Sequence, residues 1–429
     1  MATTLWTDTA MTAALKIIFD DALVNSVVAE SELMDLFEES GGIMTDQTTG
    51  GRYIETANLF ALNAGVGARS EDDYIPEASG PKIVNGRIAL KKILGTVELS
   101  NDTMKRVRSS EGAFADWADR ALPSLVDRLN NELDRMLLGY GAGIKTRVND
   151  ATPATNLVVD SPFGIAGAGL DEKSALLMHL SGETLRASAN ADGSTPRALA
   201  MTVTAVDWDN GYLIVDQLAT SLADDDYLFP GDAAGNSAGK EMMGLFGIVD
   251  DGSVLVTFQN ISRTTYPEWR SYVIDAIADV AAGTKLTEDL LLRVDDQAYI
   301  QGAASVDTLI ASRYGLRQYW ADLKSDRSIN DPRAYVGGKM GVSVLLGDRE
   351  IVLKAPRKMP DNVAFGVTKK HLKRWTLHQW EWQDQTGSIW KQVTDATGRK
   401  DAHYAYGAMY GEVGSDDPQK HFRIENIAV

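Results

Sequence analysis

The five histidines are the side chains best suited to acid–base or metal chemistry, but their spacing does not group them. The sequence has no Cys, so thiolate metal sites, disulfides and thiol nucleophiles are impossible. No HExxH or other close pairing of metal ligands is present. The five are His179, His371, His378, His403 and His421, and the seven-residue spacing of His371 and His378 predicts structural or surface roles for these two.

Two glycine-rich stretches, GYGAG at 139–143 and FGIAGAG at 163–169, invite comparison with phosphate-binding loops. Neither has the GxxxxGK[ST] spacing, and GYGAG follows a predicted helix instead of a strand. Turn formation is the better interpretation of both stretches.

The aspartates give two weak metal signals. DWDNG at 207–211 resembles the start of a calcium loop, but its glycine comes one place early and no Glu closes the loop. A hairpin turn explains it fully. ADDDYLFPGD could hold a cation without any diagnostic spacing, between Asp224, Asp225, Asp226 and Asp232. No GxSxG elbow is present, and none of the many possible carboxylate pairs is singled out as that of a glycosidase.

Charge argues against a protein that grips nucleic acid through phosphates. The 429 residues include 60 acids and 42 Lys or Arg, a net charge of −18, whereas such proteins carry basic surfaces. Acids crowd the first fifty residues, against Lys16 alone: Asp8, Asp20, Asp21, Glu30, Glu32, Asp35, Glu38, Glu39 and Asp46. This segment is interpreted as a solvated face, as one that must avoid DNA, or as one that pairs with a basic patch on another subunit.

No segment has the pattern of a signal peptide or a membrane span. The most apolar early run, 10–29, is interrupted by Lys16, Asp20 and Asp21. Length and composition are those of a folded protein of two or three domains, and we expect a soluble protein made in a cytoplasm.

The helical elements begin at the N-terminus. Residues 1–40 predict two short helices, the second with a stripe of Leu33, Leu36 and Phe37, and this segment should dock elsewhere because it cannot form its own core. Apolar residues at three- and four-residue steps predict a long helix over 111–138, kinked at Pro123 and ended by the glycines of 139–143.

The stretch from Gly50 to Ser100 predicts a long two-stranded hairpin with a charged, breaker-rich tip. Val97 and Leu99 alternate with polar residues as in a half-buried strand. Arms of roughly 20 residues would reach ~60 Å. A lone ribbon is marginal in water, so it needs another surface to lie on.

The remaining chain alternates between β and α/β patterns. MTVTAVDWDNGYLIVD at 201–216 predicts a hairpin with a type I′ turn at Asn210-Gly211, followed by a loop over 222–239. Thr287 should cap a helix from Glu288, another helix follows near 316–323, and 341–355 predicts a hairpin. Strands recur after 363. Basic clusters at 91–92, 105–108 and 369–374 are interpreted as solvated faces or as salt-bridge partners of acidic segments on neighbours.

This order of elements resembles the major capsid protein of tailed bacteriophages, the α+β Hong Kong 97-type fold. The most similar stretches are KKILGTVELSNDTMKRV, AFADWADRALPSLVDRLNNELDRMLLGYGAG, KEMMGLFGIVDDG, TYPEWRSYV, LTEDLLLRVDDQAYIQG and DTLIASRYGLRQYW. The resemblance implies an N-terminal arm over 1–45, an extended loop over 46–100, a peripheral domain with spine helix over 101–150, an inserted β-rich domain over 151–239, a peripheral return over 240–275, an axial domain over 276–362 and peripheral C-terminal strands over 363–429.

By that resemblance the chain is a structural subunit and not an enzyme. It would assemble as hexamers and pentamers into an icosahedral virion shell around double-stranded DNA, without cofactors and without sequence-specific DNA binding. We expect negligible affinity of the isolated subunit for duplex DNA at physiological salt. The implied inter-subunit contacts are Tyr74, Ile75, Pro76, Lys82, Arg87, Lys91 and Lys92 in the loop, Glu32, Asp35, Glu38 and Glu39 in the arm, and Lys105, Arg106 and Arg108 after the loop.

The resemblance also implies partners. We expect a separate scaffolding protein, a portal, a decoration or cement protein and no membrane, with assembly in the host cytoplasm. The arm is too short for a large scaffolding region, so no maturation cleavage is expected, and nothing predicts a Lys–Asn cross-link. Two alternatives stay open: an encapsulin-like shell, whose chains are generally shorter and lack a large insertion, and a soluble carboxylate-dependent hydrolase.

Overall fold

A computed structural model gives the arrangement of the chain. It describes residues 31–39, 53–63, 65–71, 73–77, 80–100, 111–150, 155–165, 172–219, 221–232, 235–281, 283–326, 342–346, 349–384, 391–395 and 398–428. Within these ranges, none of the helices combines the length and apolar character that a bilayer crossing demands.

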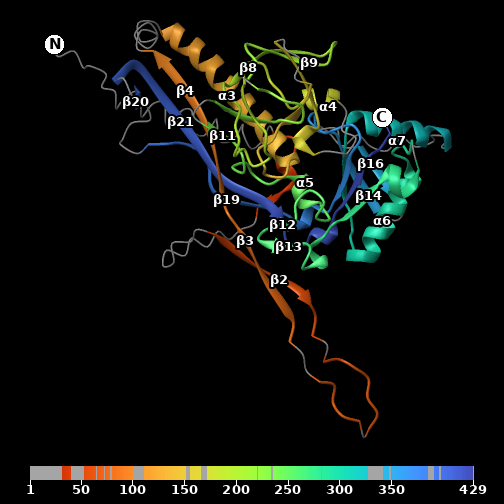
Figure 1. Ribbon diagram of the computed structural model, residues 1–429. Helices are drawn as coiled ribbons and strands as arrows, with labels where there is room; N and C mark the ends of the chain where they lie inside the picture. Colours follow the sequence, from red (N-terminus) through yellow and green to blue (C-terminus); the bar gives the residue numbers. More distant parts are fainter. Residues whose placement is uncertain are drawn as a thin grey trace.

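One long sheet crosses the upper part of the molecule (Figure 1). Its strands are β1 (Glu38–Glu39), β19 (Leu372–Trp382), β21 (Gly398–Ser415), β20 (Lys391–Asp395) and β4 (Lys91–Ser100). β21 is the hub, because β19, β20 and β4 all pair with it antiparallel, whereas β1 adds to β19 in parallel. The alternating patterns predicted after residue 363 are therefore strands of a sheet that also takes in β4.

The long helix has the bounds that its apolar stripe predicted. α3 (Glu111–Leu138) contacts β4 and continues through Pro123 as one element. Its last turns bury Leu129, Leu133 and Leu137 in the main core. The helix ends before glycines as predicted, and Gly141 and Gly143 adopt φ of 78° and 80°, a region that favours glycine.

A second, mixed sheet packs with two helices. Its order is β14 (Tyr272–Asp275), β22 (Phe422–Glu425), β18 (Ala364–Val367), β15 (Thr308–Ala311), β17 (Arg349–Lys354) and β16 (Val342–Leu346). The flanking helices are α6 (Glu288–Gly302) and α7 (Arg313–Asp326). Thr287 caps α6 as predicted, since its Oγ1 accepts from the backbone N–H of Leu290 at 3.3 Å. The predicted hairpin is β16–β17.

The inserted region closes into a six-stranded antiparallel barrel. Around the ring run β5 (Thr146–Asp150), β6 (Asn156–Asp160), β9 (Tyr212–Val215), β8 (Met201–Asp207), β7 (Thr184–Ser188) and β10 (Tyr227–Asp232), which returns to β5. The barrel thus begins at Thr146 and encloses its own apolar core. Closure leaves no sheet edge around the ring.

Two sequence predictions for the barrel were wrong. The stretch 222–239 was predicted as loop, yet 227–232 is strand β10. Pro230 is tolerated because β10 pairs with β5 only at Tyr227 and Leu228, leaving that side of Pro230 unpaired. The predicted type I′ turn is also wrong: only Gly211 has positive φ, and the Asp207 carboxylate orders a wider turn by accepting from the N–H groups of 209 and 210.

Short elements complete the fold. They are α4 (Glu172–Leu176), α5 (Leu245–Ile248), β11 (Gly235–Asn236), β12 (Thr257–Phe258), β13 (Ile261–Ser262), the π-helix η4 (Ala276–Val280) and the 3-10 helices η1 (Met34–Leu36), η2 (Pro162–Gly164), η3 (Pro267–Trp269), η5 (Lys369–His371) and η6 (Pro418–Lys420).

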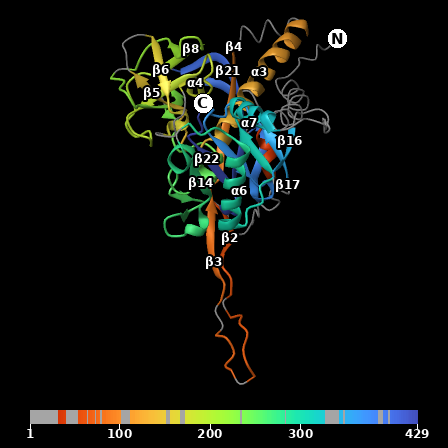
Figure 2. The same ribbon diagram turned by 90° about the vertical axis from the view of Figure 1, so that its right-hand side faces the viewer.

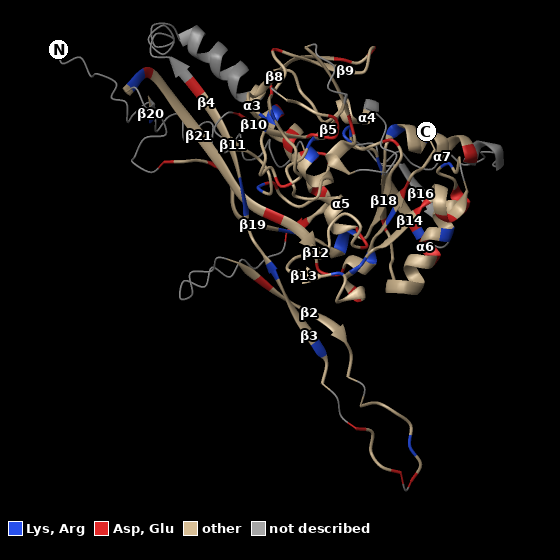
Figure 3. Ribbon diagram, viewed as in Figure 1, with Lys and Arg blue, Asp and Glu red and all other residues tan. Residues whose placement is uncertain are grey.

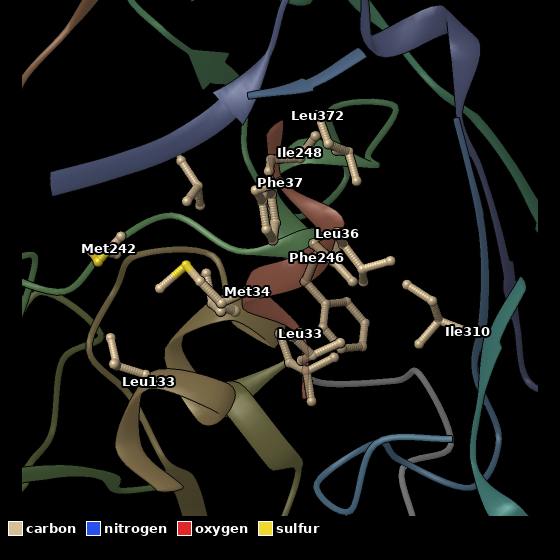
Figure 4. Packing of buried hydrophobic residues seen from close by; sticks show 14 of the residues in the cluster. Leu33, Met34, Leu36, Phe37, Leu133, Met242, Phe246, Ile248, Ile310 and Leu372 are labelled. Atoms are coloured by element: carbon tan, nitrogen blue, oxygen red, sulfur yellow. The ribbon is translucent and has the colours of Figure 1, made fainter. Parts of the chain in front are cut away.

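The described part of the N-terminal arm docks on its own chain. Leu33, Met34, Leu36 and Phe37 are buried in the main core, beside Phe246 among others (Figure 4). The second predicted helix is shorter than expected, because η1 spans one turn and the chain then extends into β1. The first predicted helix lies outside the described residues.

Candidate intersubunit surface

A narrow hairpin projects from the body in both orthogonal views (Figures 1 and 2). β2 (Ile54–Ala61) and β3 (Lys82–Ile88) pair antiparallel, from Ile54↔Ile88 to Ala61↔Lys82. The paired arms are shorter than predicted. Val97 and Leu99 are not on the hairpin, since β4 leaves it and pairs with β21 over ten positions.

The inner face of the hairpin is anchored to the body. The Phe60 ring lies 5.1 Å from that of Tyr266 and 5.5 Å from that of Trp269. The Lys82 ammonium lies 4.8 Å from the Tyr266 ring centre, and the Arg87 N–H donates to the Gln259 carbonyl at 2.8 Å. The base of the ribbon therefore has intrachain support.

The outer face has no such cover within the described chain. Leu59 and Ile83 are cross-strand partners, and each is 57% exposed. Glu55 and Arg87 are also partners, and their side chains form an exposed ion pair at 3.0 Å. An exposed pair of this kind contributes little stability by itself, about 0–1 kcal/mol.

Beyond the paired strands, apolar side chains stand in solvent. Leu62 and Val66 are largely exposed, and Tyr74 and Ile75 are 94% and 90% exposed. A turn between Ser70 and Asp73 shapes the end of the loop, and charges of both signs lie along it (Figure 3). Burying one large apolar side chain gains roughly 1.5–3 kcal/mol, so covering this end would stabilise it considerably.

The acidic arm forms ion pairs with the basic cluster at 369–374. The sequence predicted such pairs between neighbouring subunits, and here they form within one chain. Glu38 lies 3.1 Å from Lys373 and Glu39 lies 3.6 Å from Arg374, where β1 runs beside β19. Within the chain these two pairs form in cis, and contacts of the same residues with a neighbouring subunit stay a prediction. The sequence pattern identified the complementary charges, and the pairing of β1 with β19 brings them together within one chain.

The remaining predicted contact residues, in the arm and in the loop, differ in their exposure to solvent and in their contacts. Glu32 accepts from the backbone N–H of Arg357 at 3.1 Å, and Asp35 is exposed. The Lys91 ammonium donates to the Gly239 carbonyl at 2.7 Å, and that of Lys92 lies 5.2 Å from the ring centre of a β21 tyrosine. Pro76 is half-buried at the loop end. Three further predicted contacts lie outside the described residues: Lys105, Arg106 and Arg108.

Comparison with known proteins finds similarity only to solved structures. No protein-family model and no curated protein matches the chain. The cyanophage A-1(L) capsid asymmetric unit is 13% identical with a TM-score of 0.47, covering 88% of this chain and 89% of that chain. The satellite phage P4 procapsid, which includes the Sid protein, is 10% identical with a TM-score of 0.38, covering 95% and 99%. The capsid of an empty GTA particle is 9% identical with a TM-score of 0.40, covering 93% and 90%.

The chain is similar to capsid proteins over most of its length.

Two buried histidines form constellations that the sequence did not reveal. His179 Nδ1 lies 2.6 Å from Glu183 Oε1, and its Nε2 lies 2.9 Å from Thr146 Oγ1. This carboxylate–imidazole–hydroxyl order resembles a hydrolase triad. Thr146 is completely buried, however, and Glu183 also binds Lys145 at 2.5 Å. The constellation therefore cross-links the barrel and does not present a nucleophile to solvent.

The second histidine has the wrong tautomer for a general base. The Thr368 backbone N–H donates to His421 Nδ1 at 3.2 Å, so Nε2 carries the ring proton and donates to Ser415 Oγ at 3.1 Å. Burial lowers the pKa of His421 to about 3. The ring stays neutral and cannot accept the serine proton through Nε2.

Two of the four aspartates considered for a cation bind arginines instead, while Asp224 and Asp232 accept from backbone N–H groups. Asp226 accepts two hydrogen bonds of 2.8 Å from Arg197, and Asp225 lies 3.3 Å from Arg147. Among the described residues, no group of His, Asp and Glu is suited to holding a metal ion. The carboxylates of Asp225 and Asp226 thus link the segment before β10 to Arg147 and Arg197 of the inserted region.

Proposed function

We propose that this chain is a major capsid protein of a tailed phage. It self-assembles as hexamers and pentamers into the icosahedral shell that encloses the double-stranded DNA genome. The observation that carries the proposal is the projecting hairpin, whose base is anchored at Phe60 while Tyr74 and Ile75 extend uncovered into solvent. A monomer gains nothing from this element, whereas a neighbouring copy can cover it.

Each region has a role in this proposal. The loop over 46–100 lies across an adjacent subunit, and the domain over 276–362, with α6 and α7, lies toward the symmetry axes. Residues 101–150, 240–275 and 363–429 form the peripheral domain. The inserted region over 151–239, with β5, faces outward. Many weak copies of one contact in a closed shell act together, so each can be modest.

The partners follow from the same role. A separate scaffolding protein directs assembly in the host cytoplasm, a portal occupies one vertex, and the outer barrel is available to a decoration protein. The net charge of −18 suits a shell that must not hold packaged DNA tightly.

Negative-stain microscopy of the purified full-length protein, alone and with its scaffolding protein, tests the proposal. Shells, curved sheets or capsomer rings are expected. A stable monomer or dimer under both conditions would overturn it. Sedimentation velocity on the same samples gives the distribution of masses without adsorption to a grid.

A further inference from the structure

Buried charges join α3 to the barrel. Glu132 on α3 accepts from Arg135 Nε at 2.9 Å and from Lys145 Nζ at 2.7 Å. Lys145 also binds Glu183, and Arg135 binds Glu241, both at 2.5 Å. Because both cations are almost fully buried, each depends on its carboxylates for compensation.

The buried amine of Lys358 interacts electrostatically with Glu132 and other members of this network but makes no hydrogen bond to them. Lys358 is 4% exposed, and its Nζ has no hydrogen-bond acceptor among the described residues. Its segment, 356–362, is held by its flanks: the Arg357 N–H donates to Glu32, and the Asp361 N–H donates to Ser174 on α4 at 3.3 Å. The backbone beside Lys358 is thus held in place, while its amine has no hydrogen-bond partner among the described residues.

The network of Glu132, Glu183, Glu241, Arg135 and Lys145 has a formal charge of −1, which one added proton would neutralise. Its three carboxylates exceed its two cations, and burial lowers the pKa of His179, so that ring stays neutral at neutral pH. An ammonium at Lys358 would balance the excess negative charge. Charged and titratable groups surround the segment on several elements. On α3 they are Glu132, Asp134 and Arg135, and at the barrel they are Lys145, His179 and Glu183. The others are Glu32 on the arm, Glu241 after the barrel, and Arg357 and Asp361 beside Lys358.

We propose that Lys358 is a proton-controlled contact: its neutral amine leaves the 356–362 segment unbonded to the α3–barrel network, and its ammonium binds Glu132. Burial lowers the pKa of Lys358 to about 7 while Glu132 opposes that shift, so both forms are populated near neutral pH. The contact links the second sheet, α3 and the barrel. It does not depend on whether the chain forms shells.

Hydrogen–deuterium exchange on the full-length protein at pH 6 and pH 8, corrected for intrinsic exchange rates, tests this contact. Peptides covering 356–362 should be protected by about threefold more at pH 6. Lys358→Met should show the high-pH pattern at both pH values, and Lys358→Arg the low-pH pattern at both, because Arg stays charged. The exposed control Lys285→Met should keep the wild-type difference.

Absence of a pH difference in the wild-type peptides would overturn the proposal. So would a wild-type difference that survives in either Lys358 variant. If one variant does not fold, the other alone decides, because each removes the titration. A merely structural role predicts the same pattern in the Met and Arg variants, whereas the proposal predicts opposite patterns.

Discussion

Asp250 lies between two completely buried guanidinium groups. Its Oδ2 is 3.1 Å from Arg263 Nη1 and its Oδ1 is 3.1 Å from Arg423 Nη2. Burial opposes ionisation of Asp250, but the two arginines lower its pKa below the usual range. The arginines also donate to backbone carbonyls around α5, among them those of Gly247 and Val249. This cluster ties the α5 turn to β22.

Replacing Asp250 by Asn should destabilise the fold by about 3–5 kcal/mol, because it removes the carboxylate that two buried cations share and leaves Arg423 only its pair with Glu425. The urea midpoint of the full-length protein measures the change. Asp251→Asn is the matched control, since Asp251 is exposed, and it should change stability by less than about 1 kcal/mol. Equal effects of the two substitutions would contradict this account of the cluster.

Glu412 on β21 is a second buried carboxyl group, and its pKa is shifted in the opposite direction to that of Asp250. Its Oε1 accepts from the backbone N–H groups of Met243 and Val413, and burial raises its pKa to about 7. Below about pH 4.5 the carboxyl is protonated in both folded and unfolded chains. Between about pH 4.5 and pH 7 the unfolded carboxyl ionises while the buried one stays protonated, so stability falls across this range and levels off once the pH has passed the folded pKa.

Glu412→Gln should therefore raise the free energy of unfolding by about 2–3 kcal/mol at pH 8 and by almost nothing at pH 4. Urea unfolding at several pH values measures this. Glu98→Gln, at an exposed position on the paired strand β4, should show no such pH dependence. A gain that is constant from pH 4 to pH 8 would exclude ionisation as its cause.

At the scale of elements, the hairpin is divided into an anchored base and an unsupported end. Phe60→Ala should release the base, because it removes the ring contacts with Tyr266 and Trp269. The cost should be about 1–3 kcal/mol, less than for a fully buried Phe. Limited proteolysis should then cleave between 54 and 88 faster while α3 and the barrel stay resistant. Leu59→Ala, on the exposed outer face, is the control and should leave the cleavage rate unchanged in dissociated subunits.

Local chemistry predicts some elements well and others poorly. The apolar stripe and closing glycines predicted α3 over 111–138, and Thr287 predicted the start of α6. The strand β10 was missed because a proline usually interrupts a strand. Pro230 is compatible with β10 because it pairs with β7 on one side and has no partner in β5 on the other. β4 was assigned to the hairpin because its partner, β21, is far away in sequence and periodicity does not name partners.

The same limit applies to the candidate surface. The breaker-rich, charged stretch between the strands predicted an exposed end, and Tyr74 and Ile75 stand there. The anchor at Phe60 could not be predicted, since Trp269 reaches it only through the fold. Glu38 and Lys373 were recognised as complementary types, but the sequence offered no means of telling a cis pair from a trans pair.

At the scale of the whole molecule, shell formation should depend on the hairpin end. The double substitution Tyr74→Ser and Ile75→Ser should leave the subunit folded, because both side chains are exposed, and reduce assembly by about tenfold or more. Sedimentation velocity measures the assembled fraction. Trp208→Ser, a substitution of a half-exposed aromatic on the barrel, should assemble normally. Unimpaired assembly of the double variant would remove the hairpin end from the interface.

Hydrogen exchange across residues 62–81, compared between dissociated subunits and assembled particles, is the most direct measurement. The account predicts rapid exchange there in lone subunits and at least about tenfold protection in particles, with the 54–61 base changing less. Strong protection of 62–81 in a subunit that never associates would contradict it.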